Sequence, residues 1–345
     1  MATATRARPR AFRIANRVAR RYELAIALAL LLVWDAWREQ VDEAALERAI
    51  QGQQGIGSVE TAAGIAVLAL LLMRSPTIER DLLLTTRDTG SAATDALRAL
   101  GFDGTAIGLG PPGFVRSAPN IGIAVARQLG VLTDTMRGQA QETVRAIMAF
   151  GAAEGLSAQR VALAIREAMP LRAPHALAPL RFEAELRAKD TRALRRLLHD
   201  PSLPPARQKA MAARVAHEIR ARFDADAVTE EWIERHRLAY IRNLEKRRAL
   251  DIARTETMRS ANFGLREAWR QAVQSGALPK DVRRRWVNVL DNRLRPTHAA
   301  IPGMNPDGVG LDEPFLTPLG YFLDPPIEIN CRCSVSLGVG PVGVL

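Results

Sequence analysis

Apolar and polar positions alternate with the period of α-helices over most of the chain, as far as about residue 275. Ser58 and Ser157 are in cap positions, and Ser75-Pro76 places a proline at a first helical position. Glycine-rich stretches at 51–57 and 104–119 predict loops between helices. The pattern predicts helices over 22–50, 58–73, 91–101, 120–150 and 157–169, a basic helix ending at His199, and one or two long helices over 206–274.

The pattern changes after residue 275. Residues 285–290 contain β-branched side chains and predict a strand, and residues 327–335 alternate in the manner of a final strand. Between them, residues 291–326 are rich in glycine and proline and predict a loop. The predicted fold class is mostly α: a long-helix N-terminal part, followed by a C-terminal α+β module that ends in a small irregular β unit.

The length of 345 residues suggests two folded units. The proline-rich segment 200–205 is the strongest candidate for a linker. We therefore predict four consecutive parts, which are a basic arm at 1–21, a helical N-terminal domain at 22–150, a helical connector with the linker at 151–204, and a C-terminal domain at 205–345.

Two apolar runs, Leu24–Trp34 and Ala62–Met73, are shorter than the roughly 20 residues that span a bilayer. They predict buried helices, covered by their neighbours. Transient membrane contact through these helices is the alternative. A secretory signal fits poorly, because Glu23 opens the first run and no small-residue cleavage site follows it.

Basic residues exceed acidic ones by 48 to 37, a net charge of +11, and all but four of the basic residues are arginine. Residues 205–300 hold 21 basic and 12 acidic residues. Such clusters favour a polyanion such as double-stranded DNA, bound through its backbone, and solvated helix faces are the alternative. The candidate DNA-binding residues are seven arginines in 1–21, a segment without acidic residues, and three before the predicted strand: Arg6, Arg8, Arg10, Arg13, Arg17, Arg20, Arg21, Arg283, Arg284 and Arg285.

Aromatic residues make up only 5% of the chain, which argues against a cleft lined by aromatic rings for carbohydrates or nucleobases. The cysteines are only two, Cys331 and Cys333, so a disulfide-stapled scaffold is excluded and a reducing compartment is indicated.

Residues i and i+2 of a strand point to the same face, so the two thiols should lie together. With Asp291 and His298 they could complete a tetrahedral zinc site. Two alternatives stay open, which are buried structural thiols beside a hydrogen-bonding histidine and a catalytic cysteine–histidine pair.

Small residues surround Glu256 at helical spacing, namely Ala249, Ala253, Ser260 and Gly264. A face of this kind lets another element approach closely and cover Glu256, and a covered carboxylate needs a cationic partner. We expect an ion pair between Glu256 and Arg293 or Arg295. A general-base role for Glu256 is the alternative, although the sequence places no nucleophile beside it.

Four fragments occur in a fixed order: residues 252–256 (Ile-Ala-Arg-Thr-Glu), residues 286–298 from Trp to Asp-Asn-Arg-Leu-Arg-Pro-Thr-His, Pro314-Phe315 with Gly320, and residues 330–333 (Asn-Cys-Arg-Cys). In this order and spacing, residues 205–335 resemble the C-terminal domain of the phage Mu F-like family of minor head, or head-morphogenesis, proteins. The resemblance implies a non-enzymatic virion protein inside the capsid near the portal. Its role would be in head assembly and in DNA packaging or delivery, with portal and capsid proteins as partners and no small-molecule substrate.

Two other functions are compatible with these residues. One is a metal-dependent enzyme or toxin-like effector built on the same C-terminal domain, since Asp291, His298 and the two cysteines could hold a catalytic metal. The other is a host DNA-binding protein with a defined DNA site. The sequence contains no Walker-type glycine loop, H-E-x-x-H or G-x-S-x-G motif.

Overall fold

A computed structural model describes residues 9–52, 55–102, 113–190, 205–224, 227–339 and 343–344. Arg6, Arg8, most of the loop predicted at 104–119, the end of the basic helix at His199 and most of the linker predicted at 200–205 lie outside these residues.

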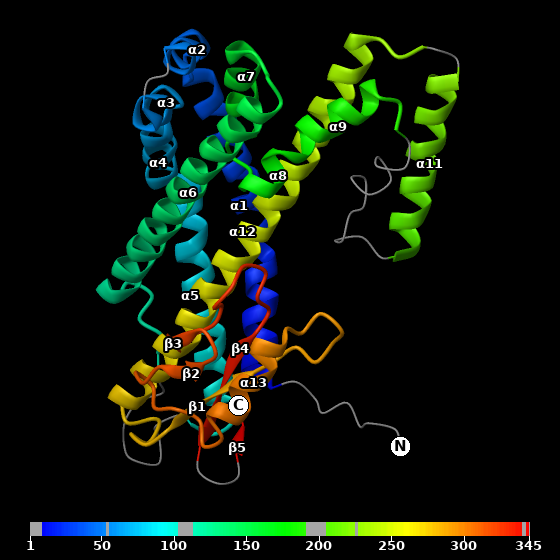
Figure 1. The fold of residues 1–345 in the computed structure, drawn as a ribbon. Helices are drawn as coiled ribbons and strands as arrows, with labels where there is room; N and C mark the ends of the chain where they lie inside the picture. Colours follow the sequence, from blue (N-terminus) through cyan, green and yellow to red (C-terminus); the bar gives the residue numbers. More distant parts are fainter. Residues whose placement is uncertain are drawn as a thin grey trace. The chain divides into compact units, whose positions relative to one another are not determined.

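Helices dominate the described chain, and the strands lie at its C-terminal end (Figure 1), so the predicted fold class is confirmed. The helices are α1 Arg10–Gln40, α2 Glu43–Gln51, α3 Ile56–Ala62, α4 Ile65–Met73, α5 Pro76–Arg98, α6 Pro119–Ala153, α7 Ala158–Ala168, α8 Ala173–Ala176, α9 Ala178–Arg187, α11 Pro205–Asp224, α12 Glu230–Gln274 and α13 Pro296–Met304. The strands are β1 Arg283–Val287, β2 Phe315–Thr317, β3 Gly320–Phe322, β4 Ser334–Val339 and β5 Gly343–Val344.

The chain forms two compact units, and neither is continuous in sequence. The first unit contains residues 1–30, 74–131 and 249–345, and the second contains 31–73 and 132–248. The helices α1, α6 and α12 therefore contribute residues to both units. The prediction of consecutive domains differs from this division, because reading along the chain detects breaks between elements and not the packing of distant helices.

Local signals account for most helix ends. Ser157 caps α7 by accepting a hydrogen bond from the Arg160 amide, and α5 begins at Pro76, as predicted. The helix predicted at 22–50 is interrupted, and Asp42 caps α2 through the Ala45 amide at 2.9 Å. The helix predicted at 58–73 is also two helices, α3 and α4, separated at Gly64, whose φ of 67° breaks the helix. The short helix predicted at 91–101 is the end of α5.

Residues 10–21 of the basic arm predicted at 1–21 form the first turns of α1. Ala11, Ala15 and Ala19 are buried in the core of the first unit. The five arginines of the same stretch are exposed on the helix: Arg10, Arg13, Arg17, Arg20 and Arg21. The arginines dominate the pattern of this stretch, although the alanines between them form its buried side.

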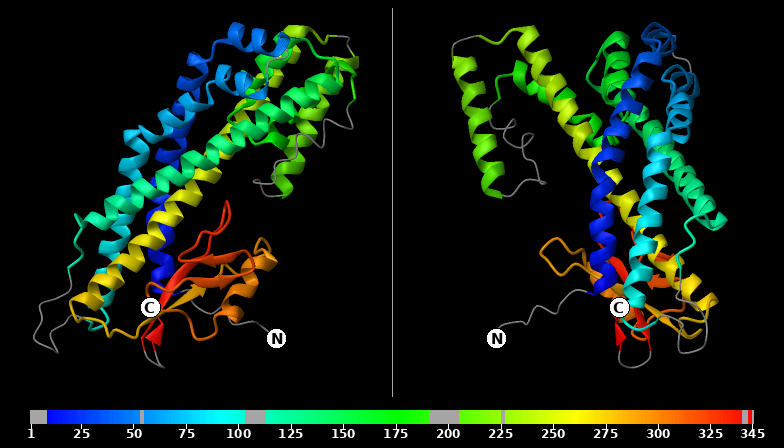
Figure 2. Two further views of the ribbon diagram at one scale, coloured as in Figure 1. Left: turned by 60° about the vertical axis from the view of Figure 1, so that its left-hand side comes forward. Right: turned by 180° about the vertical axis from the view of Figure 1, so that it is seen from behind.

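The core of the first unit joins N-terminal helices to the C-terminal strands. Ala15 of α1, Leu97 of α5 and Trp269 of α12 share one buried cluster with Trp286 of β1 and Val335 of β4. Figure 2 shows the N-terminal half of α1 and helix α5 beside the C-terminal half of α12, with the strands against them. The region that resembles the Mu F-like domain is thus completed by helices from the start of the chain.

The β elements are small and irregular. β4 is antiparallel to β1 and β5 in a three-stranded sheet, with Trp286 opposite Val335, while β2 and β3 form a hairpin. The strand predicted at 285–290 lies at 283–287, and the final strand predicted at 327–335 begins only at Ser334. The loop predicted at 291–326 contains α13 and the hairpin, because Pro296 starts a helix and Gly320 (φ 110°) allows the tight turn.

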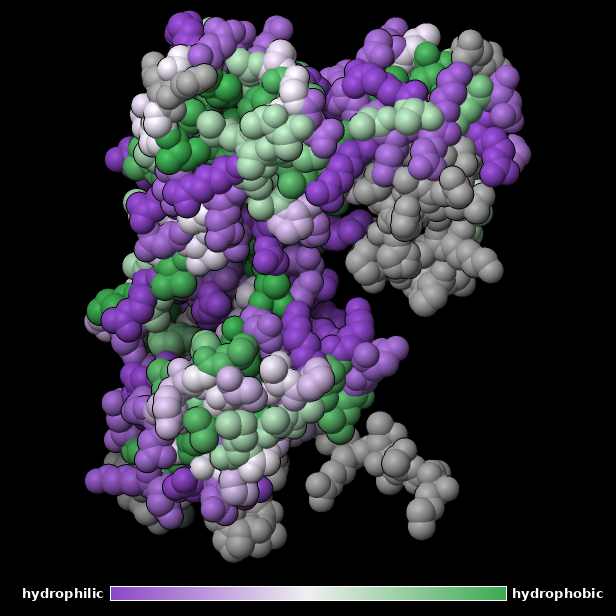
Figure 3. Space-filling view, in the orientation of Figure 1, coloured by the Kyte–Doolittle hydropathy of each residue, from purple (hydrophilic) through white to green (hydrophobic). Residues whose placement is uncertain are grey.

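The second unit is helical in its described residues. One cluster packs Phe182 and Leu186 of α9, Ile219 of α11 and Trp232 of α12. No single described helix is long and apolar enough to cross a membrane, and only the bent pair α3 and α4 taken together has such a length and composition among the described residues. On the face seen in Figure 3, hydrophobic side chains reach the surface in several places with hydrophilic ones between them.

The predicted face of small residues on α12 is confirmed. Ala253 and Ser260 are buried, and the hydroxyl of Thr86 on α5 donates to the Ser260 carbonyl at 3.3 Å. A Cβ at Gly264 would lie 2.4 Å from the Thr86 carbonyl oxygen. Glycine at 264 therefore permits a backbone-to-backbone approach of α5 and α12.

The change Gly264→Ala should lower the free energy of unfolding by about 1–3 kcal/mol, because the added methyl group forces two helix backbones apart. Gly130→Ala on α6 is the matched control, since a Cβ there meets no atom within 4 Å and the higher helix propensity of alanine should stabilise the helix slightly. Urea unfolding followed by circular dichroism compares the two variants. Equal stabilities would contradict the close approach.

Candidate functional site

The two cysteines and His298 come together beside the sheet. His298 is on the first turns of α13, and the pairing of Val287 with Ser334 brings the residues before β4 next to α13. The Nδ1 atom of His298 lies 3.5 Å from the sulfur of Cys331 and 3.4 Å from that of Cys333. All three side chains are buried, with residue exposures of 1% for Cys331 and 2% for both Cys333 and His298. We call these three residues the Cys-Cys-His cluster.

Polar neighbours fix the orientation of the histidine ring. Nε2 of His298 lies 2.8 Å from a carboxylate oxygen of Glu328. The amide of Asn288 donates to the His298 carbonyl at 2.9 Å, and its oxygen lies 3.3 Å from the sulfur of Cys333. Sequence reasoning missed Glu328 and Asn288, because neither belongs to a spacing pattern with the cluster.

The two thiols titrate differently. A hydrogen bond with Cys333, opposed by burial and helped by a bond with His298, lowers the pKa of Cys331 to about 5. The bond with Cys331, together with burial, raises the pKa of Cys333. The bond to Cys331 also raises the pKa of His298 despite its burial. One thiol of the pair is thus readily ionised beside the ring, which is the form that binds metal or acts as a nucleophile.

The motif residues before the cysteines are held by α12. Asn330 donates from its backbone amide to the Thr255 hydroxyl at 2.9 Å, and from its side chain to Asp251 at 2.5 Å. Arg254 donates to Asn330 at 3.3 Å and pairs with Glu23 of α1 at 2.7 Å. Asn330 has a φ of 61°, a conformation that asparagine tolerates better than most residues. These bonds set the position of Cys331.

The structure does not bring Asp291 to the cluster. Its carboxylate forms two bonds with the Arg332 guanidinium, at 2.6 and 2.8 Å, and these lower the pKa of Asp291 to about 2. The predicted four-residue metal set is therefore reduced to three, and among the described residues the group that could hold a metal is His298, Cys331 and Cys333. A shallow cavity beside the cluster is lined also by Arg293, Leu294 and Arg295.

Glu256 is covered, as predicted, but its partner is different. Its carboxylate binds Arg259 of the same helix at 2.6 Å and the Gln128 amide of α6 at 2.9 Å. Arg295 instead donates to the Ile329 carbonyl, and Arg293 lines the cavity near the cysteines. A cation one turn along the helix satisfies Glu256, which is why the predicted tie to Arg293 or Arg295 is wrong.

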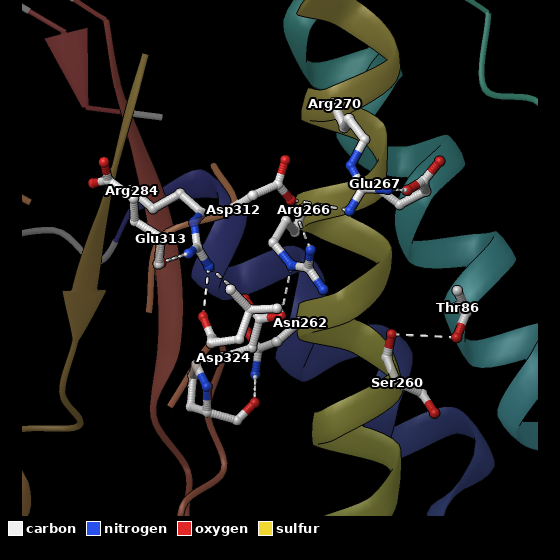
Figure 4. A network of polar contacts seen from close by, with 12 residues as sticks. Thr86, Ser260, Asn262, Arg266, Glu267, Arg270, Arg284, Asp312, Glu313 and Asp324 are labelled. Carbon is white, nitrogen blue, oxygen red and sulfur yellow. Dashed lines mark hydrogen bonds and ion pairs between the residues drawn. The ribbon is translucent and has the colours of Figure 1, made fainter. Parts of the chain in front are cut away.

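Arg284 is fully buried, which overturns its prediction as a DNA-binding residue. Its guanidinium donates to Asp324 at 2.6 Å and to the carbonyls of Leu323, Gly310 and Glu313 (Figure 4). Arg283 and Arg285 are exposed, and Arg283 binds the carbonyls of residues 307 and 308. The alternation of a strand turns the middle arginine inward, so a run of three identical residues has two environments.

The Asp324 carboxylate joins the strand to the long helix. Arg266 of α12 donates to its second oxygen at 2.8 Å, while Asn262 on the same face binds the Pro325 carbonyl and the Ser334 hydroxyl. Figure 4 shows these side chains directed from α12 toward the C-terminal segment. This polar network is a structural core, buried among residues 262–334.

Comparison with known families confirms the resemblance. Residues 208–336 match the family described as Phage Mu protein F like protein, and this range includes all four fragments, the Cys-Cys-His cluster and the Arg284 network. Neither the curated proteins nor the solved structures contain a match. The family indicates a phage head morphogenesis protein, a class that is generally structural, associated with the virion and with capsid-related proteins.

Replacing Arg284 with methionine should lower the free energy of unfolding by about 3–5 kcal/mol, because it leaves the partly buried Asp324 short of one cation and three carbonyls without a donor. Arg285→Met removes the same charge from an exposed position and should cost well under 1 kcal/mol. Urea unfolding of the two full-length variants makes the comparison. An Arg284→Met protein as stable as Arg285→Met would contradict the buried network.

Proposed function

We propose that this protein is a minor head protein that acts inside the phage capsid near the portal, where it assists head assembly and DNA packaging or delivery. The observation that carries the proposal is the family match over residues 208–336. The bond from Arg284 to Asp324 and the bond from the Asn330 amide to Thr255 join different parts of the fold, as expected of a structural protein.

Charge supports a role beside packaged DNA. Arg10, Arg13 and Arg17 recur at helical spacing and are exposed along one side of α1, with Arg20 and Arg21 one turn further. Arg283 and Arg285 are exposed on β1 of the same unit. Guanidinium groups arranged in this way bind the phosphates of the DNA backbone and do not read the base sequence.

Heads and portal rings isolated during phage assembly test the location. The full-length protein should co-purify with portal rings and empty heads in a few copies per head, as quantified by mass spectrometry. Its absence from both particles would contradict the proposal, whatever the behaviour of single variants.

Binding to a non-specific DNA duplex should weaken steeply with salt, because each phosphate contact releases counterions. The triple change of Arg10, Arg13 and Arg17 to glutamine should reduce the slope of log K against log salt by about 2–3, at about 0.9 for each contact. Fluorescence anisotropy at several salt concentrations measures this slope.

The matched control changes Arg98, Arg137 and Arg235 to glutamine, since each is exposed but already paired with an acid on its own helix. That variant carries the same charge loss and should keep most of the wild-type slope. A flat salt response of the wild type, or equal slopes for the two triple variants, would remove DNA from the proposed partners. A footprint on a defined DNA site would favour the host DNA-binding alternative.

A further inference from the structure

We propose that Cys331, Cys333 and Nδ1 of His298 bind one zinc ion, with Glu328 orienting the histidine. This proposal concerns a binding site that the head function does not require, and it does not rest on that function. It is carried by the geometry of the Cys-Cys-His cluster.

The spacing of the three atoms fits tetrahedral zinc. Zinc–sulfur bonds of about 2.3 Å and zinc–nitrogen bonds of about 2.0–2.1 Å place a sulfur and a nitrogen ligand about 3.6 Å apart. The observed separations from Nδ1 of His298 are 3.5 Å to Cys331 and 3.4 Å to Cys333. All three ligand atoms lie within 4.8 Å of one another.

The surroundings of His298 favour a metal over hydrogen bonds alone. Because Nε2 faces the Glu328 carboxylate, the ring proton belongs on Nε2 and the lone pair of Nδ1 points toward the two sulfurs. Nδ1 therefore faces both sulfurs at once, as it would around a shared metal ion. A carboxylate on the outer nitrogen is the usual second partner of a zinc-binding histidine.

The charge and the burial of the cluster also fit a zinc ion. The cluster is buried, so two thiolates there need compensating charge, which a divalent cation supplies. The cavity beside the cluster is lined by Arg293, Leu294 and Arg295, and it leaves the fourth position to water. Asp291 is held by Arg332 and takes no part, which distinguishes this three-ligand site from a four-residue one.

The burial of both sulfurs argues against the catalytic cysteine alternative. A nucleophilic thiolate must meet its substrate, and the exposures of Cys331 and Cys333 are 1% and 2%. A metal ion reaches such a site during folding and is then enclosed by it.

The test uses the full-length protein purified without chelators. Elemental analysis should find about one zinc per chain. After removal of zinc and loading with Co²⁺ alone, the absorption spectrum should show the thiolate-to-cobalt charge-transfer band and the intense d–d bands of a tetrahedral site. A folded wild-type protein that takes up neither metal, or that binds cobalt without the thiolate band, would overturn the proposal.

Variants assign the ligands. The double change Cys331→Ser and Cys333→Ser should abolish stoichiometric binding, while Glu328→Gln should weaken zinc affinity 10- to 100-fold in a chelator competition. His217→Gln, at an exposed histidine, and Asp291→Asn should bind zinc as the wild type does. Wild-type affinity in the double cysteine variant would refute the site, and loss of zinc in Asp291→Asn would refute the three-ligand assignment. Because the cobalt spectrum is read on the unmodified chain, a misfolded variant leaves the test decisive.

Discussion

One face of α12 holds a segment of chain that has little secondary structure of its own. Thr255 receives the amide of Asn330, Asn262 binds Ser334, and Arg266 binds Asp324. Each bond satisfies a polar group that burial would otherwise leave without a partner, at a cost of about 1–3 kcal/mol per group. The sheet of the first unit depends on this clamp, because it fixes the chain that leads into β4.

The clamp also fixes the positions of the two cysteines. Asn330 is bonded to α12 on one side of Cys331, and Ser334 begins the strand on the other side of Cys333. His298 approaches from α13, whose start is set by Pro296. Ligands preset in this way cost little entropy when a metal binds, whereas a site on unsupported chain would have to be ordered first. The same contacts therefore hold the segment against α12 and position the cysteines of the Cys-Cys-His cluster.

Patterns along the chain predict the helices, the small-residue face of α12 and the meeting of the cysteines with His298. They misassign the partners of two charged residues. Glu256 pairs with Arg259 one turn along the same helix and not with Arg293 or Arg295. Arg284 points inward because side chains alternate along a strand, and it pairs with Asp324 instead of phosphate. The arginines of residues 10–21 concealed a packed helix, since the small alanines between them carry its buried side. The sequence shows which charged residues are present, whereas the folded chain decides which of them are covered and which cation lies beside each carboxylate.

Amide hydrogen exchange of the full-length protein tests the clamp most directly. Thr255→Val keeps the side-chain shape but removes the hydroxyl, which accepts the Asn330 amide and donates to the Asp251 carbonyl of α12. Thr257→Val is the matched control, since its hydroxyl donates to the Arg254 carbonyl of α12 at 3.2 Å. Loss of the one hydrogen bond that joins Thr255 to the segment, about 1 kcal/mol, should speed exchange at residues 330–333 about fivefold in Thr255→Val and leave it unchanged in the control. Equal protection in both variants would show that α12 does not hold the segment and would contradict the account.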